Sequence, residues 1–237
     1  MIRIRKAADR GRTRLAWLDG RHTFSFGHAY DPEWIRFGPL RVINDDRIAP
    51  GGGFGEHPHN DMEIITLMLE GQLRHKDSSG GGGVIRPGGA QRMTAGSGVT
   101  HSEFNASDSQ PVHLLQIWII PDAKGYDPEY EERTPDQLDL EGRLALVASP
   151  DGADGSMKIH QDARMWWGRL REGAAETVTV ASGRRIWLQV ARGDATASGA
   201  GETVSLQEGD GLGLEEATEL RIAPGSGGVE VVAFDLP

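Results

Sequence analysis

Short apolar or β-branched runs, separated by turn-forming residues, constrain the fold of this chain more than any other feature. Clusters of Gly, Pro, Asn and Asp bound these runs, and glycine supplies 33 of the 237 residues, as many tight turns would require. The runs occupy residues 40–43, 63–69, 112–120, 185–190 and 229–234. Few windows show a helical period, and the best helical candidate, between Asp127 and Leu140, is interrupted by Pro135. The pattern predicts an all-β fold with short helices only.

A change in composition near the middle of the chain predicts two domains. Residues 122–150 hold eight acidic side chains against three basic ones. A weak internal repeat supports the division, because glycines that follow strand-like runs recur at similar spacings, Gly71 to Gly88 and Gly193 to Gly209. We therefore expect domains at 1–125 and 148–237, joined by an acidic linker at 126–147 that carries the short helices.

Charge and cysteine content exclude several classes of function. The chain has no cysteine, which rules out disulfides, thiolate metal sites and cysteine nucleophiles. Its net charge of −10 disfavours direct nucleic-acid binding. No apolar stretch approaches the roughly 20 residues of a membrane-spanning helix, so no membrane partner is expected. Ile2 and Ile4 alternate with arginines, which predicts an edge strand, not a secretory signal, and we expect a cytoplasmic protein.

Two pairs of ligand-type side chains carry the chemistry that the sequence predicts. His57 and His59 form one pair, and His101 and Glu103 form the other. Residues i and i+2 of a strand point to the same face, so each pair aims two donors in one direction. If the two strands are neighbours, three imidazoles and one carboxylate converge, a set that suits a divalent transition metal. A lone histidine in a strand is more often structural, so the prediction depends on the pairing of the two motifs.

The same motifs resemble those of a known family. Gly51-x5-His57-x-His59-x3-Glu63 and Gly98-x2-His101-x3-Asn105 resemble the two motifs of cupins. The chain is most similar to the pirin family of bicupins, particularly to bacterial members with quercetin 2,3-dioxygenase activity. The segments that carry this similarity are 17–19, 22–26, 40–46, 54–59, 61–64 and 94–103.

The resemblance implies a bicupin of two β-barrel or jelly-roll domains. The first, 1–125, would bind the metal, and the second, 148–237, would have no metal site. In the pirin pattern the metal ligands correspond to His57, His59, His101 and Glu103. Many other cupins take their acidic ligand from the position of Glu63. Three roles stay open for Glu63: it replaces Glu103 as the acidic ligand, it contacts the metal ligands without binding the metal, or it is a strand carboxylate hydrogen-bonded near the site.

The implied function is that of a metal-dependent dioxygenase. It would open the heterocycle of a small aromatic flavonol such as quercetin with O2 and release carbon monoxide, with Glu103 as the catalytic base. Iron(II) is the expected metal, and Ni, Cu, Co, Mn and Zn suit the same donors. No other cofactor is expected. The alternative is a metal-bearing regulatory protein that binds a protein partner, with flavonol cleavage as a side activity.

Overall fold

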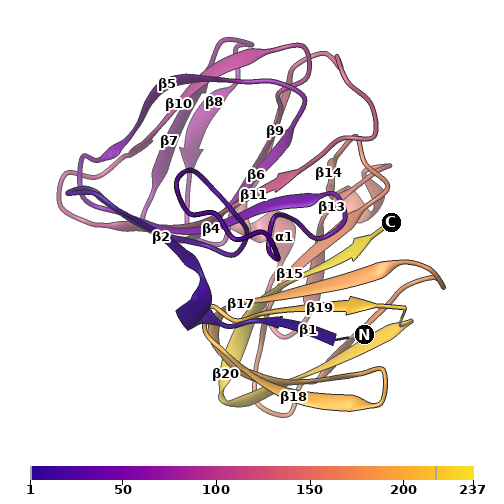
Figure 1. The fold of residues 1–237 in the computed structure, drawn as a ribbon. Coiled ribbons are helices and arrows are strands. Elements are labelled where there is room, and N and C mark those ends of the chain that lie inside the picture. The colour runs from indigo at the N-terminus through magenta and orange to yellow at the C-terminus, as the bar shows by residue number, and fades with distance from the viewer. Residues whose placement is uncertain (1, 217) are drawn as a thin grey trace. The chain divides into compact units, whose positions relative to one another are not determined.

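The computed structural model describes residues 2–216 and 218–237, and strands dominate it (Figure 1). The one α-helix in this part of the chain, α1 (Pro135–Leu138), and the 3-10 turns η1 (Ala7–Asp9) and η2 (Ala153–Gly155) are short. The strands are β1 (Ile2–Arg5), β2 (Gly11–Arg14), β3 (Leu18–His22), β4 (Leu40–Ile48), β5 (Gly53–His59), β6 (Glu63–Glu70), β7 (Leu73–Asp77), β8 (Gly82–Ile85), β9 (Ala90–Thr94), β10 (Val99–Asn105), β11 (Val112–Ile119), β12 (Glu129–Arg133), β13 (Leu144–Ser149), β14 (Met157–Lys158), β15 (Arg164–Leu170), β16 (Glu176–Thr179), β17 (Arg185–Gly199), β18 (Glu202–Gln207), β19 (Gly211–Glu215) and β20 (Glu219–Leu236). The all-β prediction is confirmed, and the five apolar runs correspond to β4, β6, β11, β17 and β20.

Contacts divide the described chain into two compact units. The amino-terminal unit comprises Gly11–Leu138 and Met157–Gln161. The carboxy-terminal unit comprises the described residues up to Arg10 together with Asp139–Ser156 and Asp162–Pro237. The domain boundaries predicted from sequence, at 125 and 148, stay a prediction, and contact density groups the residues around them somewhat differently.

Two antiparallel sheets form the amino-terminal unit. One has the strand order β5-β10-β7-β8, and the other has the order β12-β9-β6-β11-β4-β3-β2. Apolar side chains from both sheets pack in one cluster, which includes Met68 and Leu114 from the larger sheet and Leu73 from the smaller one. Alternation along each strand buries one face in this core. A second apolar cluster, which includes Ile64 from the larger sheet and Val99 from the smaller one, packs in the same unit, and the unit also buries polar side chains.

The carboxy-terminal unit is built on two long strands, β17 and β20. Its sheet has the order β1-β19-β17-β20-β15-β13, with β16 paired to β20 and β18 paired to β17. Register shifts near Arg192 and Gly193 interrupt the β17–β20 ladder, and such irregularities bend strands. Buried residues on both sides of the bend, such as Ile186 and Ala197, belong to one core cluster, so the sheet closes over its own apolar face.

The amino-terminal strand β1 belongs to this second sheet. Figure 1 shows the indigo β1 beside β19, and Ile2 pairs with Leu214 in an antiparallel register. Ile2 and Ile4 pack against the apolar core of the carboxy-terminal unit. The predicted edge strand is therefore confirmed, because β1 stands at one end of the sheet order. Lys6 then forms an ion pair with the buried Asp210, at 2.8 Å, which fixes the chain where it leaves the strand.

The internal repeat has a structural counterpart. Gly71, Gly88, Gly193 and Gly209 all have positive φ angles, from 73° to 85°, a region that favours glycine. Equivalent backbone hydrogen bonds occur in the two copies of the repeat. The Gly88 N–H donates to the Met68 carbonyl at 2.8 Å, and the Gly209 N–H donates to the Val190 carbonyl at 2.9 Å. The two units thus repeat one pattern of strand ends and turns.

The prediction of a short helix between Asp127 and Leu140 is confirmed by α1, but α1 occupies only the second half of that segment. Glu129–Arg133 forms β12, which pairs with β9, and only Pro135–Leu138 is helical. The reason is a buried arginine, since Arg92 is fully inaccessible and needs anionic partners. Glu129 lies 3.1 Å from its guanidinium, and Glu131 also contacts it. The acidic residues of this segment therefore neutralise a charge that β9 buries.

The turn at Gly96, in the amino-terminal unit, allows a test of backbone geometry. Gly96 has a φ of +49°, and a Cβ placed there would overlap the carbonyl oxygen of Tyr126. We expect Gly96→Ala to lower the free energy of unfolding by about 2–3 kcal/mol, from backbone strain plus the displaced carbonyl. Gly125→Ala is the control, because Gly125 also has a positive φ but its Cβ would meet nothing within 4 Å. Equal losses in denaturant titrations of the two variants would contradict the role of the close contact.

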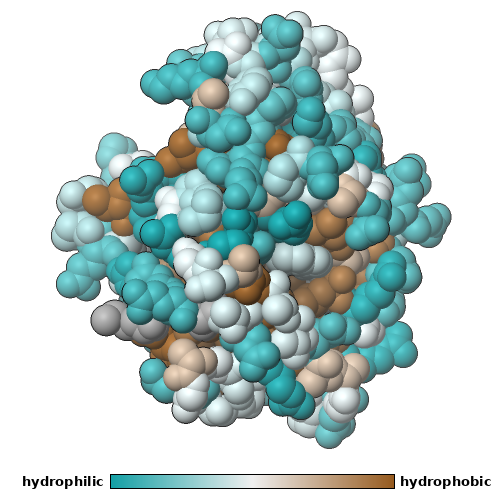
Figure 2. All heavy atoms as spheres, turned by 90° about the vertical axis from the view of Figure 1, so that its right-hand side faces the viewer, coloured by the Kyte–Doolittle hydropathy of each residue, from teal (hydrophilic) through white to brown (hydrophobic). Residues whose placement is uncertain are grey.

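The surface is largely polar. On the face that Figure 2 displays, hydrophilic residues cover most of the area, and apolar residues form small patches between them. Within the described residues, no helix is both long enough and apolar enough to cross a membrane.

Candidate metal centre

Strands β5 and β10 are neighbours in the smaller sheet, as the two histidine-containing motifs predict (Figure 1). They pair in antiparallel register, with His101 directly opposite His57 and Val99 opposite His59. A register shift follows His101, so that Glu103 stands opposite Phe54. The extra residue of this irregularity lies on β5. Glu103 is consequently on the far side of His101 from His59.

Three histidines gather at this pairing. Their closest ring nitrogens, from His57, His59 and His101, lie within 4.8 Å of one another. The ring centroids of His57 and His101 are 4.4 Å apart, and His59 lies 4.8 Å from each. His101 is buried, whereas His57 and His59 are partly exposed. The cluster thus has a buried side within the unit and an accessible side toward solvent.

The hydrogen bonds of the cluster suit a divalent cation. His57 Nδ1 donates to the Gly55 carbonyl at 2.7 Å, which leaves the lone pair of the neutral ring on Nε2. That Nε2 lies 3.0 Å from His101 Nε2. Two nitrogens this close could share one metal ion, since metal–imidazole bonds are about 2.0–2.1 Å long. The His101 Nδ1 atom has no hydrogen-bond partner among the described residues. The imidazoles present therefore fit one shared metal ion.

The Glu103 carboxylate is buried and held as a hydrogen-bond acceptor on both oxygens. Gln91 Nε2 donates to Oε1 at 3.1 Å, and Gln116 Nε2 donates to Oε2 at 2.7 Å. Thr66 Oγ1 makes a longer contact with Oε1 at 3.5 Å. Amide donors favour the ionised carboxylate. Burial nevertheless has the larger influence and raises the pKa of Glu103 above its usual range.

His75 is a residue of this site that the sequence prediction missed. It is fully buried, and its donor atoms group with those of His101 and Glu103. Its Nε2 pairs with Asp77 at 2.9 Å. The Gln91 amide nitrogen lies against both His75 Nδ1 and Glu103 Oε1, at 3.4 and 3.1 Å. Because the Gln91 NH2 group contacts both His75 and Glu103, and Asp77 pairs with the other ring nitrogen of His75, His75 is less suited to bind a cation than the three clustered histidines.

Glu63 lies in a different network. It is fully buried, and it is absent from both donor groups that the described residues form. Thr94 Oγ1 donates to one of its oxygens at 2.8 Å, and His160 Nδ1 lies 3.1 Å from the other. The His160 ring stacks on Tyr126 at 3.9 Å between centroids. This arrangement corresponds to the alternative of a strand carboxylate that is hydrogen-bonded within the sheet.

The environment of the histidines predicts acid lability in the metal-free protein. Burial lowers the pKa of His59 to about 4 and that of His101 to about 3, with neighbouring histidines adding to the effect. In the unfolded chain both groups have ordinary values near 6.5. The folded state thus binds fewer protons, and its stability is present above pH 6.5 and lost as the pH falls toward 4 and 3.

We expect the thermal unfolding midpoint of the metal-free protein to fall over that interval. His101→Ala should show a shallower fall, whereas the exposed His28→Ala should behave as the parent chain does. Thermal unfolding monitored by circular dichroism at several pH values measures the slope. Identical slopes for the parent chain and His101→Ala would contradict the expectation.

A hollow of about 380 Å³ opens beside His59. Pro58, Asn60, Ser78 and the stretch 97–100 complete its lining. Its rim offers hydroxyl and amide groups, with apolar contact from Pro58 and Val99. The lining of this hollow is thus a mixture of polar and apolar groups.

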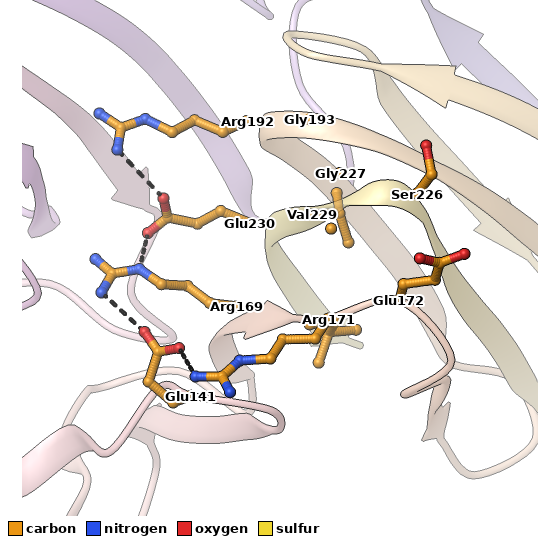
Figure 3. Close-up of a pocket in the computed structure, with 12 residues that line it drawn as sticks. Glu141, Arg169, Arg171, Glu172, Arg192, Gly193, Ser226, Gly227, Val229 and Glu230 are labelled. Atoms are coloured by element: carbon orange, nitrogen blue, oxygen red, sulfur yellow. Dashed lines mark hydrogen bonds and ion pairs between the residues drawn. The ribbon is translucent and has the colours of Figure 1, made fainter.

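A second hollow, of about 440 Å³, lies in the carboxy-terminal unit (Figure 3). Arginine and glutamate side chains alternate along one wall, in the order Arg192, Glu230, Arg169, Glu141 and Arg171, with contacts of 3.1–3.8 Å. Each guanidinium of this wall already contacts a carboxylate, and with Glu172 the lining holds three arginines and three glutamates, so it has no net formal charge. Across the described residues, every group of three or more close metal-type donors lies in the amino-terminal unit.

Comparison with known proteins identifies the class and then the family. Residues 3–119 match the family described as Pirin, and residues 146–236 match the Quercetinase C-terminal cupin domain. Two cupin domains, the first with three clustered imidazoles, define a bicupin with a candidate metal centre in its amino-terminal half. The chain is 44% identical to quercetin 2,3-dioxygenase of Escherichia coli K12, over 100% of this chain and 99% of that protein. This protein belongs to the pirin family.

Solved structures agree with that assignment. The nickel(II) complex of the bacterial pirin YhhW from Escherichia coli superposes with a TM-score of 0.92 at 43% identity, covering 100% of this chain and 99% of the other. A quercetin 2,3-dioxygenase from Acinetobacter baumannii shares the fold, with a TM-score of 0.76 at 23% identity over 95% of this chain and 84% of that one.

Proposed function

We propose that this protein is a metal-dependent dioxygenase that opens the heterocycle of a flavonol such as quercetin with O2. The observation that carries the proposal is the three-imidazole cluster, in which the Gly55 carbonyl sets the tautomer of His57, together with the buried Glu103 carboxylate that groups with His101. His57, His59, His101 and Glu103 are the proposed metal ligands. The quercetin dioxygenases and the nickel-bound pirin among its relatives support this function.

The protein residues prepare the site for a divalent ion. The Gly55 carbonyl holds the His57 ring in the tautomer that points Nε2 into the cluster. Gln91 and Gln116 hold the Glu103 carboxylate from two sides. When bound, the metal supplies Lewis-acid activation of the substrate hydroxyl and a place where substrate and O2 meet.

Glu103 is the proposed catalytic base. Its buried carboxylate groups with His101 and is suited to take the proton of an acidic enol. The substrate approaches from the accessible side of the cluster, where His57 and His59 are partly exposed. The buried side is closed by hydrogen-bonded side chains, so the base is screened from bulk water.

The decisive experiment is a turnover assay on metal-loaded protein. The chain is purified without a histidine tag, stripped with a chelator and loaded anaerobically with Fe(II), Ni(II), Co(II), Mn(II), Cu(II) or Zn(II). Quercetin and O2 are then added. We expect loss of quercetin absorbance and release of carbon monoxide with at least one metal, Fe(II) being the first candidate. If no metal yields carbon monoxide or loss of quercetin, the proposal is refuted.

The alternative function, a metal-bearing regulator of a protein partner, is less well supported. The full-length relative from Escherichia coli K12 is described as quercetin 2,3-dioxygenase, and no feature of the described residues singles out a protein-binding surface.

A further inference from the structure

Gln116 and Trp118 connect two of the proposed ligands through side chains on one face of β11. Gln116 Nε2 donates to Glu103 Oε2 at 2.7 Å. Trp118 Nε1 donates to Gln116 Oε1 at 3.1 Å. The Trp118 ring meets the His59 ring edge to face, with centroids 5.0 Å apart. One path of contacts thus runs from Glu103 through Gln116 and Trp118 to His59.

The indole group determines which end of the Gln116 amide faces Glu103. An indole N–H donates and never accepts, so it selects the amide oxygen as its partner. The amide NH2 must then point the other way, toward the Glu103 carboxylate. With the amide reversed, two oxygen acceptors would face each other at Glu103, and two N–H donors would face each other at Trp118. Both contacts would be repulsive.

Packing keeps the indole in place. The Trp118 ring also makes an edge-to-face contact with Phe26 at 5.6 Å, so it is held between Phe26 and His59. Trp118 additionally packs against a buried cluster that includes Ile64 and Met93. Its N–H is therefore presented in a fixed direction.

We propose that Trp118 is a positioning residue that orients the Gln116 amide and, through it, the Glu103 carboxylate for metal binding. The inference rests on the proposed function, because it takes Glu103 as a ligand. Outer partners of metal ligands typically contribute about 10- to 100-fold in metal affinity. Trp118 exerts its share without touching Glu103 itself.

The test measures the dissociation constant for Ni(II) in Trp118→Phe, Gln116→Met and the double variant, by competition with a chromogenic chelator. Trp118→Phe keeps an aromatic ring between Phe26 and His59 but lacks the N–H. We expect each single change to weaken binding by about 10-fold or more. The double variant should bind like Gln116→Met alone, since Trp118 acts through Gln116. Trp166→Phe, in the carboxy-terminal unit, is the matched control and should leave the constant unchanged.

A measurement on the metal-free protein separates orientation from general packing. The indole N–H resonance of Trp118 should exchange faster with solvent in Gln116→Met than in the parent chain, because its acceptor is gone. Unchanged nickel affinity in Trp118→Phe, additive losses in the double variant, or unaltered indole exchange would each overturn the inference. Failure of the parent chain to bind nickel would instead refute the proposed function, so the two failures are distinct.

Discussion

Replacing His101 with alanine is expected to remove bound metal and abolish turnover. His101 faces His57 directly across the β5–β10 ladder, and it alone belongs to both groups of close donor atoms. Its loss leaves His57 and His59 without the buried third imidazole. Because even outer partners of ligands contribute about 10- to 100-fold, the loss of a ligand should exceed roughly 100-fold in affinity. Metal analysis after gel filtration and the quercetin assay measure the two effects.

The fold should survive this substitution. The His101 Nδ1 atom lacks a hydrogen-bond partner among the described residues, so removing the imidazole also removes an unmet polar group and offsets part of the cavity cost. Circular dichroism should match that of the parent chain. His28→Ala, at an exposed histidine, is the control and should keep full occupancy. Full metal occupancy in folded His101→Ala would refute the assignment of this ligand.

The second large effect is expected at Asp46, a buried carboxyl group on β4. Its Oδ1 has no hydrogen-bond partner within the described part of the chain, and a Cβ on Gly20 would lie 2.6 Å from that atom. Burial, with added repulsion from Asp45 and Glu103, raises the pKa of Asp46 to about 8. The folded protein thus keeps a proton there that the unfolded chain releases near pH 3.9.

The sign of the effect follows from this difference in bound protons. The stability associated with protonated Asp46 is fully present below pH 4 and is lost as the pH rises through about 8. Between about pH 4 and pH 8, the free energy of unfolding falls by up to about 1.4 kcal/mol per pH unit. Asp46→Asn keeps the shape and cannot ionise. We therefore expect its stability relative to the parent chain to rise by about 3–4 kcal/mol between pH 5 and pH 8.

Denaturant titrations of the metal-free proteins at both pH values measure this difference. Glu103 contributes to the shift, so metal must be absent from both proteins. Asp108→Asn, at an exposed aspartate, controls for the change of charge and should show no such trend. A relative stability for Asp46→Asn that stays constant between pH 5 and pH 8 would show that Asp46 is ionised throughout.

Local pattern was sufficient to predict the main apolar strands and the two strands on which the candidate donors gather. The alternation of His57 with His59 and of His101 with Glu103 defines their shared faces, and the turns between the motifs bring β10 back beside β5. The ligand roles themselves stay a prediction. The strand ends that repeat, at Gly71 and Gly193, were visible as well, because left-handed turns select glycine.

Long-range pairing was not visible in the sequence. His75 and Asp77 alternate with Arg74 and Lys76, a pattern typical of a strand whose polar faces both meet water. Only the position of β7 between β10 and β8 turns His75 inward. In the same way, the sequence around Glu129 does not predict that this segment pairs with β9. The ion-pair partner of Glu129, the buried Arg92, is distant in the sequence.

The pairing of β1 with β19 has a consequence for how the nascent chain acquires its structure. Ile2 and Leu214 are 212 positions apart, the difference of their numbers. A ribosome adding about 5–20 residues per second needs roughly 10–40 s to make that length. During this delay β1 has no partner, while most of the amino-terminal unit has already emerged. Arg3 and Arg5, which alternate with its isoleucines, discourage edge-to-edge association of the waiting segment.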